Sequence, residues 1–189
     1  MIRISGGRFK GQTLKAPEGK GTRPTSAARR EALFNMLLNG MGFVPERVLD
    51  LFAGTGALGI EALSQGAHSC VFVEAAPEAL LCLRQNFERL ALSPQEASVI
   101  ASNRIKEWGE KLAKMKDFYP FDLILCDPPY QKGLSKRAMD VIGKVPEIFT
   151  EDAVLVLELA FDEDLPTLDG WNFLKERKHG QGKLCLFSR

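Results

Sequence analysis

From Arg47 onward, short apolar runs alternate with longer segments whose apolar residues recur at helical spacing. Such alternation is typical of a parallel sheet with helices on both faces, so we expect an α/β fold. The pattern predicts strands near 47–51, 69–74, 97–101, 121–126 and 153–159, and helices near 57–65, 77–91, 104–117 and 134–144.

The end of the chain departs from this alternation. Two strand-like runs, Phe173 to Lys178 and Lys183 to Phe187, flank the short segment His179-Gly180-Gln181-Gly182. A segment of this length forms a hairpin but leaves no room for a crossover helix. We therefore expect a mostly parallel seven-stranded sheet whose last strand is antiparallel.

Positive charge is concentrated at the start of the chain. Residues 1–30 hold eight Lys or Arg and one acidic residue, whereas the whole chain has a net charge of only +1. Apolar residues interrupt these charges and Gly6-Gly7 offers a turn, so we expect an ordered N-terminal β-hairpin. This basic arm, residues 1–24, suits a polyanionic partner such as nucleic acid, although a solvated terminus is the plainer alternative. A single larger domain, residues 25–189, follows it.

A glycine-rich loop follows the first strand of the alternating region. Gly54, Gly56 and Gly59 match G-x-G-x-x-G, which binds a cofactor where a strand leads into a helix. Glu74 ends the next strand, at the offset where an acid holds ribose hydroxyls. A nicotinamide dinucleotide and S-adenosylmethionine both fit this loop. Asp50 favours S-adenosylmethionine, because its carboxylate would attract an ammonium group and repel a pyrophosphate. The predicted cofactor site also includes Phe52, Ala53, Thr55 and Ala75.

The tetrapeptide Asp127-Pro128-Pro129-Tyr130 directly follows the apolar run Phe121 to Cys126. Prolines cannot continue a central strand, so the chain must leave the sheet here, at the edge where open α/β sheets bind ligands. Asp127 and a proline carbonyl could accept hydrogen bonds from an NH2 group, and Tyr130 could stack on its flat ring. A strand-ending turn without function is the simpler alternative for the tetrapeptide alone.

Bulk composition fits one globular domain in a reducing compartment. The chain has 189 residues and is 45% hydrophobic, enough for a sizeable core. Its four cysteines show no spacing typical of zinc, so we expect no metal site. We also expect a cytoplasmic protein, because the sequence contains neither a signal peptide nor an apolar stretch long enough to span a membrane.

Together these motifs resemble the class I S-adenosylmethionine-dependent methyltransferases, and within them the RsmD-type enzymes. The resemblance runs from Arg3-Ile4-Ser5-Gly6-Gly7 through Thr22-Arg23-Pro24-Thr25-Ser26 and the glycine loop to the Asp-Pro-Pro-Tyr segment. It implies a Rossmann-like fold and methylation of a guanine N2 amine in 16S ribosomal RNA, either free or within a small-subunit particle, by a monomeric enzyme. It also implies cofactor contacts from Asn103 and Arg104, catalysis by Asp127, Pro128, Pro129 and Tyr130, and RNA contacts from Arg8, Lys10, Arg23 and Thr25.

The chain departs from the family pattern at two places. Ala27-Ala28 stands where the family usually has Asp-Arg, and Asn103 stands where it has an Asp near the adenine. The first departure leaves Arg29 or Arg30 as candidates to replace the lost contacts. The second weakens the assignment of Asn103 more than the assignment of function.

Other functions remain open from sequence. An N6-adenine methyltransferase on DNA or RNA would use the same grip on an exocyclic amine. Methylation of a side-chain amide, RNA binding without turnover, and nicotinamide oxidoreduction are further alternatives. Intact Asp50, Gly54, Gly56 and Asp127 argue against a non-catalytic scaffold.

Overall fold

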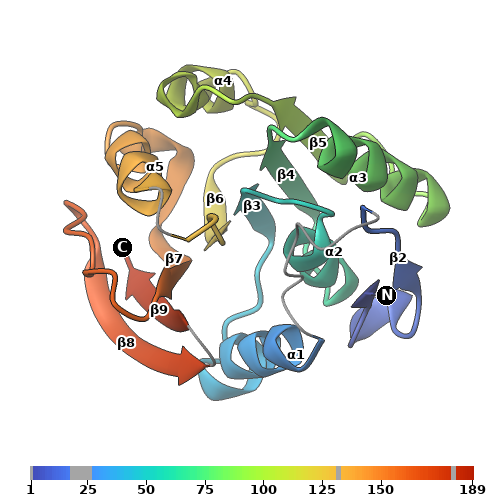
Figure 1. Cartoon of the computed structure of the whole chain (residues 1–189), viewed down its shortest axis with the longest axis horizontal. Coiled ribbons are helices and arrows are strands. Elements are labelled where there is room, and N and C mark those ends of the chain that lie inside the picture. Colours follow the sequence, from blue (N-terminus) through green and yellow to red (C-terminus); the bar gives the residue numbers. More distant parts are fainter. Residues whose placement is uncertain (1, 18–26, 131–132, 180–181) are drawn as a thin grey trace.

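A seven-stranded sheet with strand order β5-β4-β3-β6-β7-β9-β8 runs through the molecule (Figure 1). The computed structural model describes residues 2–17, 27–130, 133–179 and 182–189. The first five strands in this order pair in parallel, whereas β9 is antiparallel to both of its neighbours, which confirms the predicted sheet. The strands are β3 (Arg47–Leu51), β4 (Ser69–Glu74), β5 (Ala97–Ala101), β6 (Phe121–Cys126), β7 (Phe149–Ala160), β8 (Asn172–His179) and β9 (Gly182–Ser188).

Helices cover both faces of the sheet, as the alternation predicts (Figure 1). One face packs on α1 (Ala27–Asn35), α2 (Ala57–Ser64) and α3 (Pro77–Arg89). The other packs on α4 (Trp108–Ala113) and α5 (Leu134–Ile142). Four shorter segments complete the description: η1 (Gly7–Phe9), the π-helix η2 (Met36–Gly40), η3 (Ile105–Glu107) and η4 (Pro146–Ile148).

The helix predicted over 104–117 is shorter and split. A single 3-10 turn, η3, leads into α4, which ends at Ala113. Consecutive turns follow, in which Met115 N–H donates to Leu112 O and Phe118 N–H donates to Met115 O. These turns bury Phe118 in the core beneath α4, so burial of one aromatic side chain overrides the helical pattern.

The N-terminal hairpin forms, but its turn is not where the sequence places it. Strands β1 (Ile2–Arg3) and β2 (Thr13–Leu14) pair antiparallel, and η1 lies between them. Gly6-Gly7 does not close a two-residue turn, because the backbone there binds α2 instead. The N–H groups of Ser5 and Gly6 donate to the Glu61 carboxylate at 2.9–3.2 Å. A Cβ on Gly7 would overlap the backbone of Ser64, so only glycine permits this approach.

Buried polar side chains fasten the hairpin to the body. Arg30 on α1 forms an ion pair with Glu61 at 3.6 Å and donates to Arg3 O at 2.6 Å, and both charged side chains are fully buried. Asn86 on α3, also buried, accepts from Lys15 N–H at 2.7 Å and donates to Thr55 O at 3.0 Å. The hairpin is thus tied to the glycine loop itself. No helix among the described residues is long and apolar enough to cross a bilayer.

Candidate active site

Three acidic residues from adjacent strands lie on one face of the sheet at its carboxyl end. Asp50 is on β3, Asp127 directly follows β6, and Glu158 is on β7. The register pairs Asp50 with Leu125 and Cys126 with Leu157, so Asp127 and Glu158 stand level with each other, and Asp50 lies two positions earlier on the adjacent strand. Because side chains alternate along a strand, each acid shares the α1–α2 face with the apolar residue two positions before it.

A cavity of about 410 Å³ opens at this edge. Its size is within the range of small-molecule sites. The glycine loop and the Asp-Pro-Pro-Tyr segment, which are far apart in sequence, both line it. The full lining is Ile2, Ala16, Pro17, Arg29, Asp50, Phe52, Ala53, Gly54, Thr55, Ala57, Leu58, Glu74, Ala76, Ala79, Asp127, Pro128, Pro129, Tyr130 and Glu158.

The three glycines of the loop have different surroundings. Gly54 has φ +56°, and a Cβ there would meet nothing within 4 Å, so its backbone faces open space in the cavity. A Cβ on Gly59 would stand 2.6 Å from Cys70 Sγ, which shows that Gly59 allows α2 to pack closely on β4. Gly56 packs similarly against Leu83 on α3. Only the first glycine therefore offers direct access to a ligand.

Phe52, just before this loop, has a left-handed backbone with φ 60°. Non-glycine residues rarely adopt this conformation, and they tend to do so at functional sites. The ring packs edge-on against Trp108 with 5.0 Å between centroids, which holds the strained residue in place.

Glu74 caps the loop from the neighbouring strand. Its carboxylate accepts backbone N–H bonds from Gly54 at 2.6 Å and from Ala75 and Ala76 at 2.7 Å. A carboxylate has about four acceptor positions, so roughly one remains for a ligand hydroxyl. Glu74 lines the cavity, whereas Ala75 is exposed and contributes its N–H to this contact.

Asp50 is fully buried beneath the cavity and accepts a hydrogen bond from Gly59 N–H at 2.9 Å. Burial, which is the largest cause, acts with the neighbouring Asp127 and Glu74 against the lowering effect of the Gly59 bond, and together they raise the pKa of this carboxyl to about 8. Asp50 is therefore mostly protonated at neutral pH without a ligand. A cationic ligand group would favour its ionised form.

Tyr130 is held by a residue that the sequence does not single out. The Tyr130 hydroxyl donates to Glu158, which also forms an ion pair with Arg29 at 3.4 Å. Burial and the bond to Glu158 raise the pKa of Tyr130 well above its usual range. An acid within the apolar strand Val154-Leu155-Val156-Leu157-Glu158-Leu159 is a signal that could have found this residue.

A second cavity of about 250 Å³ adjoins the first. Arg29, Leu58, Asp127 and Glu158 line both cavities and so form their boundary. The remaining lining comes from α1, η2, β6, β7, β8 and β9 and is mostly apolar: Ala32, Leu33, Met36, Leu125, Cys126, Val156, Arg177, Lys178 and Leu184.

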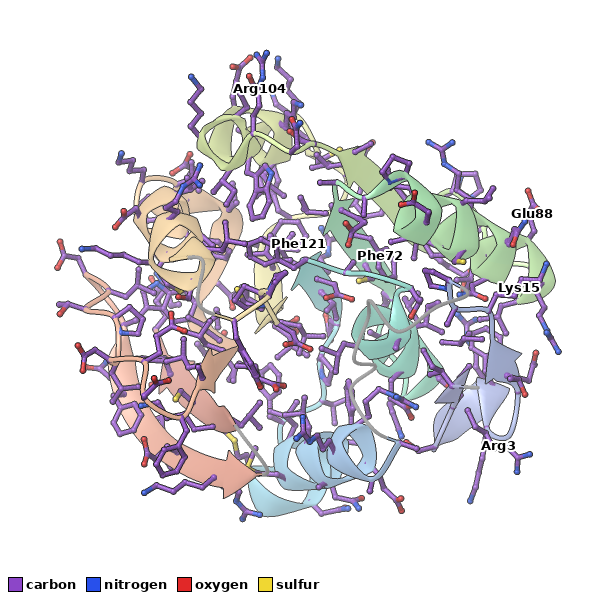
Figure 2. The ribbon with its side chains drawn as sticks, in the orientation of Figure 1. Arg3, Lys15, Phe72, Glu88, Arg104 and Phe121 are labelled. Atoms are coloured by element: carbon purple, nitrogen blue, oxygen red, sulfur yellow. The ribbon has the colours of Figure 1, made fainter. Side chains whose placement is uncertain are left out.

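Several predicted site residues do not line either cavity. Asn103 is exposed, and Arg104 points outward at the rim of the molecule, where it pairs with Glu107 at 2.9 Å (Figure 2). Ala75, Gly56 and Gly59 contribute backbone or packing rather than cavity surface.

Two of the four predicted RNA-binding residues lie within the described part of the chain. Arg8 pairs with Glu96 at 2.5 Å and stacks over Phe9, while Lys10 is exposed. Arg23 and Thr25 lie outside the described residues. In the part of the chain that the structure describes, no three His, Cys, Asp or Glu side chains gather as a metal site would require.

Comparison with known proteins agrees with this architecture. YlbH of Bacillus subtilis is 35% identical over 181 residues, spanning 96% of this chain and 94% of that protein. Ribosomal RNA small subunit methyltransferase D of Escherichia coli is 31% identical over 190 residues, spanning 100% and 90%. The solved structure of yhhF from Escherichia coli superposes with a TM-score of 0.79 at 30% identity, covering 100% of this chain and 97% of that one. The family model described as Conserved hypothetical protein 95 matches residues 2–188, and the chain belongs to that family, which is the RsmD-type family that its motifs resemble.

Proposed function

We propose that this protein transfers a methyl group from S-adenosylmethionine to the N2 amine of a guanine in 16S ribosomal RNA. One observation carries the proposal: Gly54 of the cofactor loop and Asp127 of the Asp-Pro-Pro-Tyr segment line the same cavity. The relatives named Ribosomal RNA small subunit methyltransferase D support a ribosomal RNA substrate.

The cavity suits the methyl donor. Gly54 leaves room for close approach, Glu74 retains an acceptor position for a ribose hydroxyl, and buried Asp50 provides a carboxyl group for an ammonium. When bound, S-adenosylmethionine supplies a methyl group activated by its positively charged sulfur.

The protein's own groups act on the acceptor amine. The lone pair of a guanine N2 is delocalised into the ring, so the amine is a weak nucleophile. Asp127 and the Pro128 carbonyl would accept its two N–H bonds and direct the lone pair toward the methyl carbon. As the new N–C bond forms and the bond between the methyl carbon and sulfur breaks, positive charge passes from sulfur to nitrogen, where the Asp127 carboxylate would stabilise it. The excess proton then leaves to Asp127 or water. Alignment of the amine with the methyl group and electrostatic stabilisation of the transition state supply most of the rate acceleration.

The test is methyl transfer from labelled donor to 30S subunits of a strain that lacks this protein. We expect Asp127→Ala to lower the rate by at least ~100-fold, the typical effect of removing one electrostatic contact in the transition state. Affinity for S-adenosylhomocysteine, measured by calorimetry, should stay within about two-fold, since binding of this product does not use the groups that hold the acceptor amine. Equal rates for the two proteins would disprove the role of Asp127.

Mass mapping of the methylated nucleotide identifies the base and the nitrogen atom that accept the methyl group. Label on guanine N2 supports the proposal, whereas label on adenine N6 would replace it with the alternative activity. Naked 16S RNA assayed beside the 30S subunits shows which of the two is the substrate.

A further inference from the structure

We propose that the second cavity receives the acceptor base and that Glu158, with Arg29, selects guanine by its Watson–Crick edge. This inference rests on the proposed function and adds to it the residues that choose the base. The boundary between the two cavities carries it, because Asp127, Glu158 and Arg29 all lie there.

Each group on the Watson–Crick edge of guanine can be given a complementary group on the protein. The N2 amine, the N1–H donor and the O6 acceptor follow one another along one edge of the base. Asp127 and Glu158 stand on neighbouring strands, about 4.8 Å apart, on the same face of the sheet. Glu158 is therefore next to the residue that grips N2, where an acceptor for N1–H is needed. Arg29, whose guanidinium is 3.4 Å from Glu158, would then supply a donor for O6.

Adenine would present the opposite pattern to these groups. Its N1 is an acceptor and would face the Glu158 carboxylate, and its N6 amine would face the Arg29 guanidinium. The first contact would bring two acceptors together and the second two donors, in a site where the Glu158 side chain is only 8% exposed. A site built to bond a donor rejects an analogue that lacks it, because its own buried group is left without that partner.

Glu158 keeps acceptor capacity for this task. Its carboxylate already accepts from the Tyr130 hydroxyl and pairs with Arg29. A carboxylate has about four acceptor positions, so a base N–H can be added without breaking these contacts. The bond to Tyr130, which lines the first cavity, also holds the Glu158 carboxylate at the boundary between the two cavities.

The cavity has the walls that a base requires. Leu33, Met36 and Leu125 supply apolar surface, while Arg177 and Lys178 lie at its β8 side as cations for the neighbouring phosphates. Phe161 follows β7, is 53% exposed, and carries Lys178 Nζ 4.8 Å from its ring centroid. An aromatic ring beside cations is a typical surface for single-stranded RNA.

The experiment uses a short RNA hairpin carrying the mapped target nucleotide as either guanine or 2-aminopurine. The analogue keeps the amine but lacks N1–H and O6. We expect wild type to prefer guanine and Glu158→Gln to reduce that preference about 10-fold, because the neutral amide gives a weaker bond to N1–H than the carboxylate. The amide of the Glu158→Gln variant can still accept a hydrogen bond from the Tyr130 hydroxyl. If Glu158 only held Tyr130 in place, the preference for guanine over 2-aminopurine would therefore be unchanged. Glu151→Gln, an exposed change on the same strand, is the matched control and should retain the wild-type preference.

A second variant tests the cavity independently of Glu158. Ala32→Phe puts a ring into it from α1, and should lower methyl transfer at least ~10-fold with unchanged affinity for S-adenosylhomocysteine. Asn35→Phe adds the same ring on the exposed surface of that helix and should be nearly neutral. Equal activity of the two variants would overturn the location of the base. An unchanged guanine preference in a folded Glu158→Gln protein would overturn the selection, and failure of wild type to methylate any RNA would instead overturn the proposed function.

Discussion

Gly182, the first residue of β9, lies directly beneath the hydroxyl of Tyr130. A Cβ at this position would overlap the hydroxyl oxygen and stand 3.1 Å from the ring carbon Cζ. It would also stand 2.9 Å from Leu159 O, so the backbone has no room to yield. The antiparallel end of the sheet thus supports a side chain that comes from a loop more than fifty residues earlier.

Gly182→Ala should therefore displace Tyr130 and lower methyl transfer about 10-fold or more. Affinity for S-adenosylhomocysteine should be nearly unchanged, because the glycine loop is untouched. The measurement is the rate of methyl transfer at saturating donor. Gly40→Ala is the control, since a Cβ there meets only Met36 Cγ at 3.9 Å. Full activity in Gly182→Ala would show that Tyr130 need not keep this position.

Affinity for S-adenosylhomocysteine should rise with pH up to about 8. The pKa of Asp50 is raised to about 8 in the ligand-free protein, and the ligand ammonium favours the ionised carboxylate. Binding at lower pH must release a proton, so affinity should fall by up to ~10-fold per pH unit below 8. Calorimetry at pH 6, 7 and 8 measures this slope. Asp50→Asn should bind weakly with little pH dependence, and a flat profile for wild type would refute the contact.

The raised pKa of Asp50 has the opposite effect on the stability of the ligand-free protein. Asp50 has a pKa of about 8 when folded and about 3.9 when unfolded. The native state binds the extra proton, so this contribution to stability is complete at low pH and is lost as pH rises toward 8. We expect the melting temperature of Asp50→Asn, relative to wild type, to increase between pH 5 and pH 8. A constant difference across this range would contradict the prediction.

Glu61→Ala should destabilise the protein by about 3–5 kcal/mol, the usual cost of leaving a buried charge without its counter-ion. Arg30 would lose its carboxylate, and the N–H groups of Ser5 and Gly6 would lose their acceptor. Urea unfolding measures the change. Glu88→Ala is the control, because Glu88 is exposed on α3 (Figure 2). A loss below about 1 kcal/mol would mean that the hairpin is not held through this contact.

If the basic arm holds RNA phosphates, replacing Arg8 and Lys10 with Gln should raise KM for 30S subunits. The salt dependence of log KM should decrease by about two, roughly one for each lost phosphate contact. Donor affinity should not change, since neither residue lines the cavity. Lys114→Gln with Lys116→Gln, exposed beyond α4, is the matched control. Identical salt slopes for the two double variants would assign RNA binding to another surface.

Sequence patterns predict the centre of this fold well and its long-range contacts poorly. The first four predicted strands match the observed strands residue for residue; β3, β4 and β6 are mostly buried apolar runs, and the edge strand β5 buries Ala97 and Ile100. The fifth, β7, begins earlier than predicted, since Phe149 pairs with Phe121 while the exposed Glu151 and Asp152 interrupt the apolar pattern. The hairpin turn is misplaced because its determinant, Glu61, lies 56 residues from Ser5.

The candidate site shows the same difference between local sequence patterns and long-range contacts. The order of strand, loop and tetrapeptide places Gly54 and Asp127 near one another before any coordinates are known. The sequence does not predict Glu158 as a site residue, because its partners Tyr130 and Arg29 are 28 and 129 residues away in the chain. No local pattern encodes that juxtaposition. It arises from the pairing of β6 with β7 and the packing of α1 across them.

The shared orientation of Asp50, Asp127 and Glu158 makes the sheet a template for the reaction. A strand alternates its side chains with a period of two, so inserting one residue within β3, β6 or β7 would send its acid to the α4–α5 face. Insertions and deletions can therefore be tolerated in the loops of this protein. Within a strand, before its acid, they cannot. The hydrogen-bond ladder, rather than any single side chain, fixes the spacing at which the chemistry takes place.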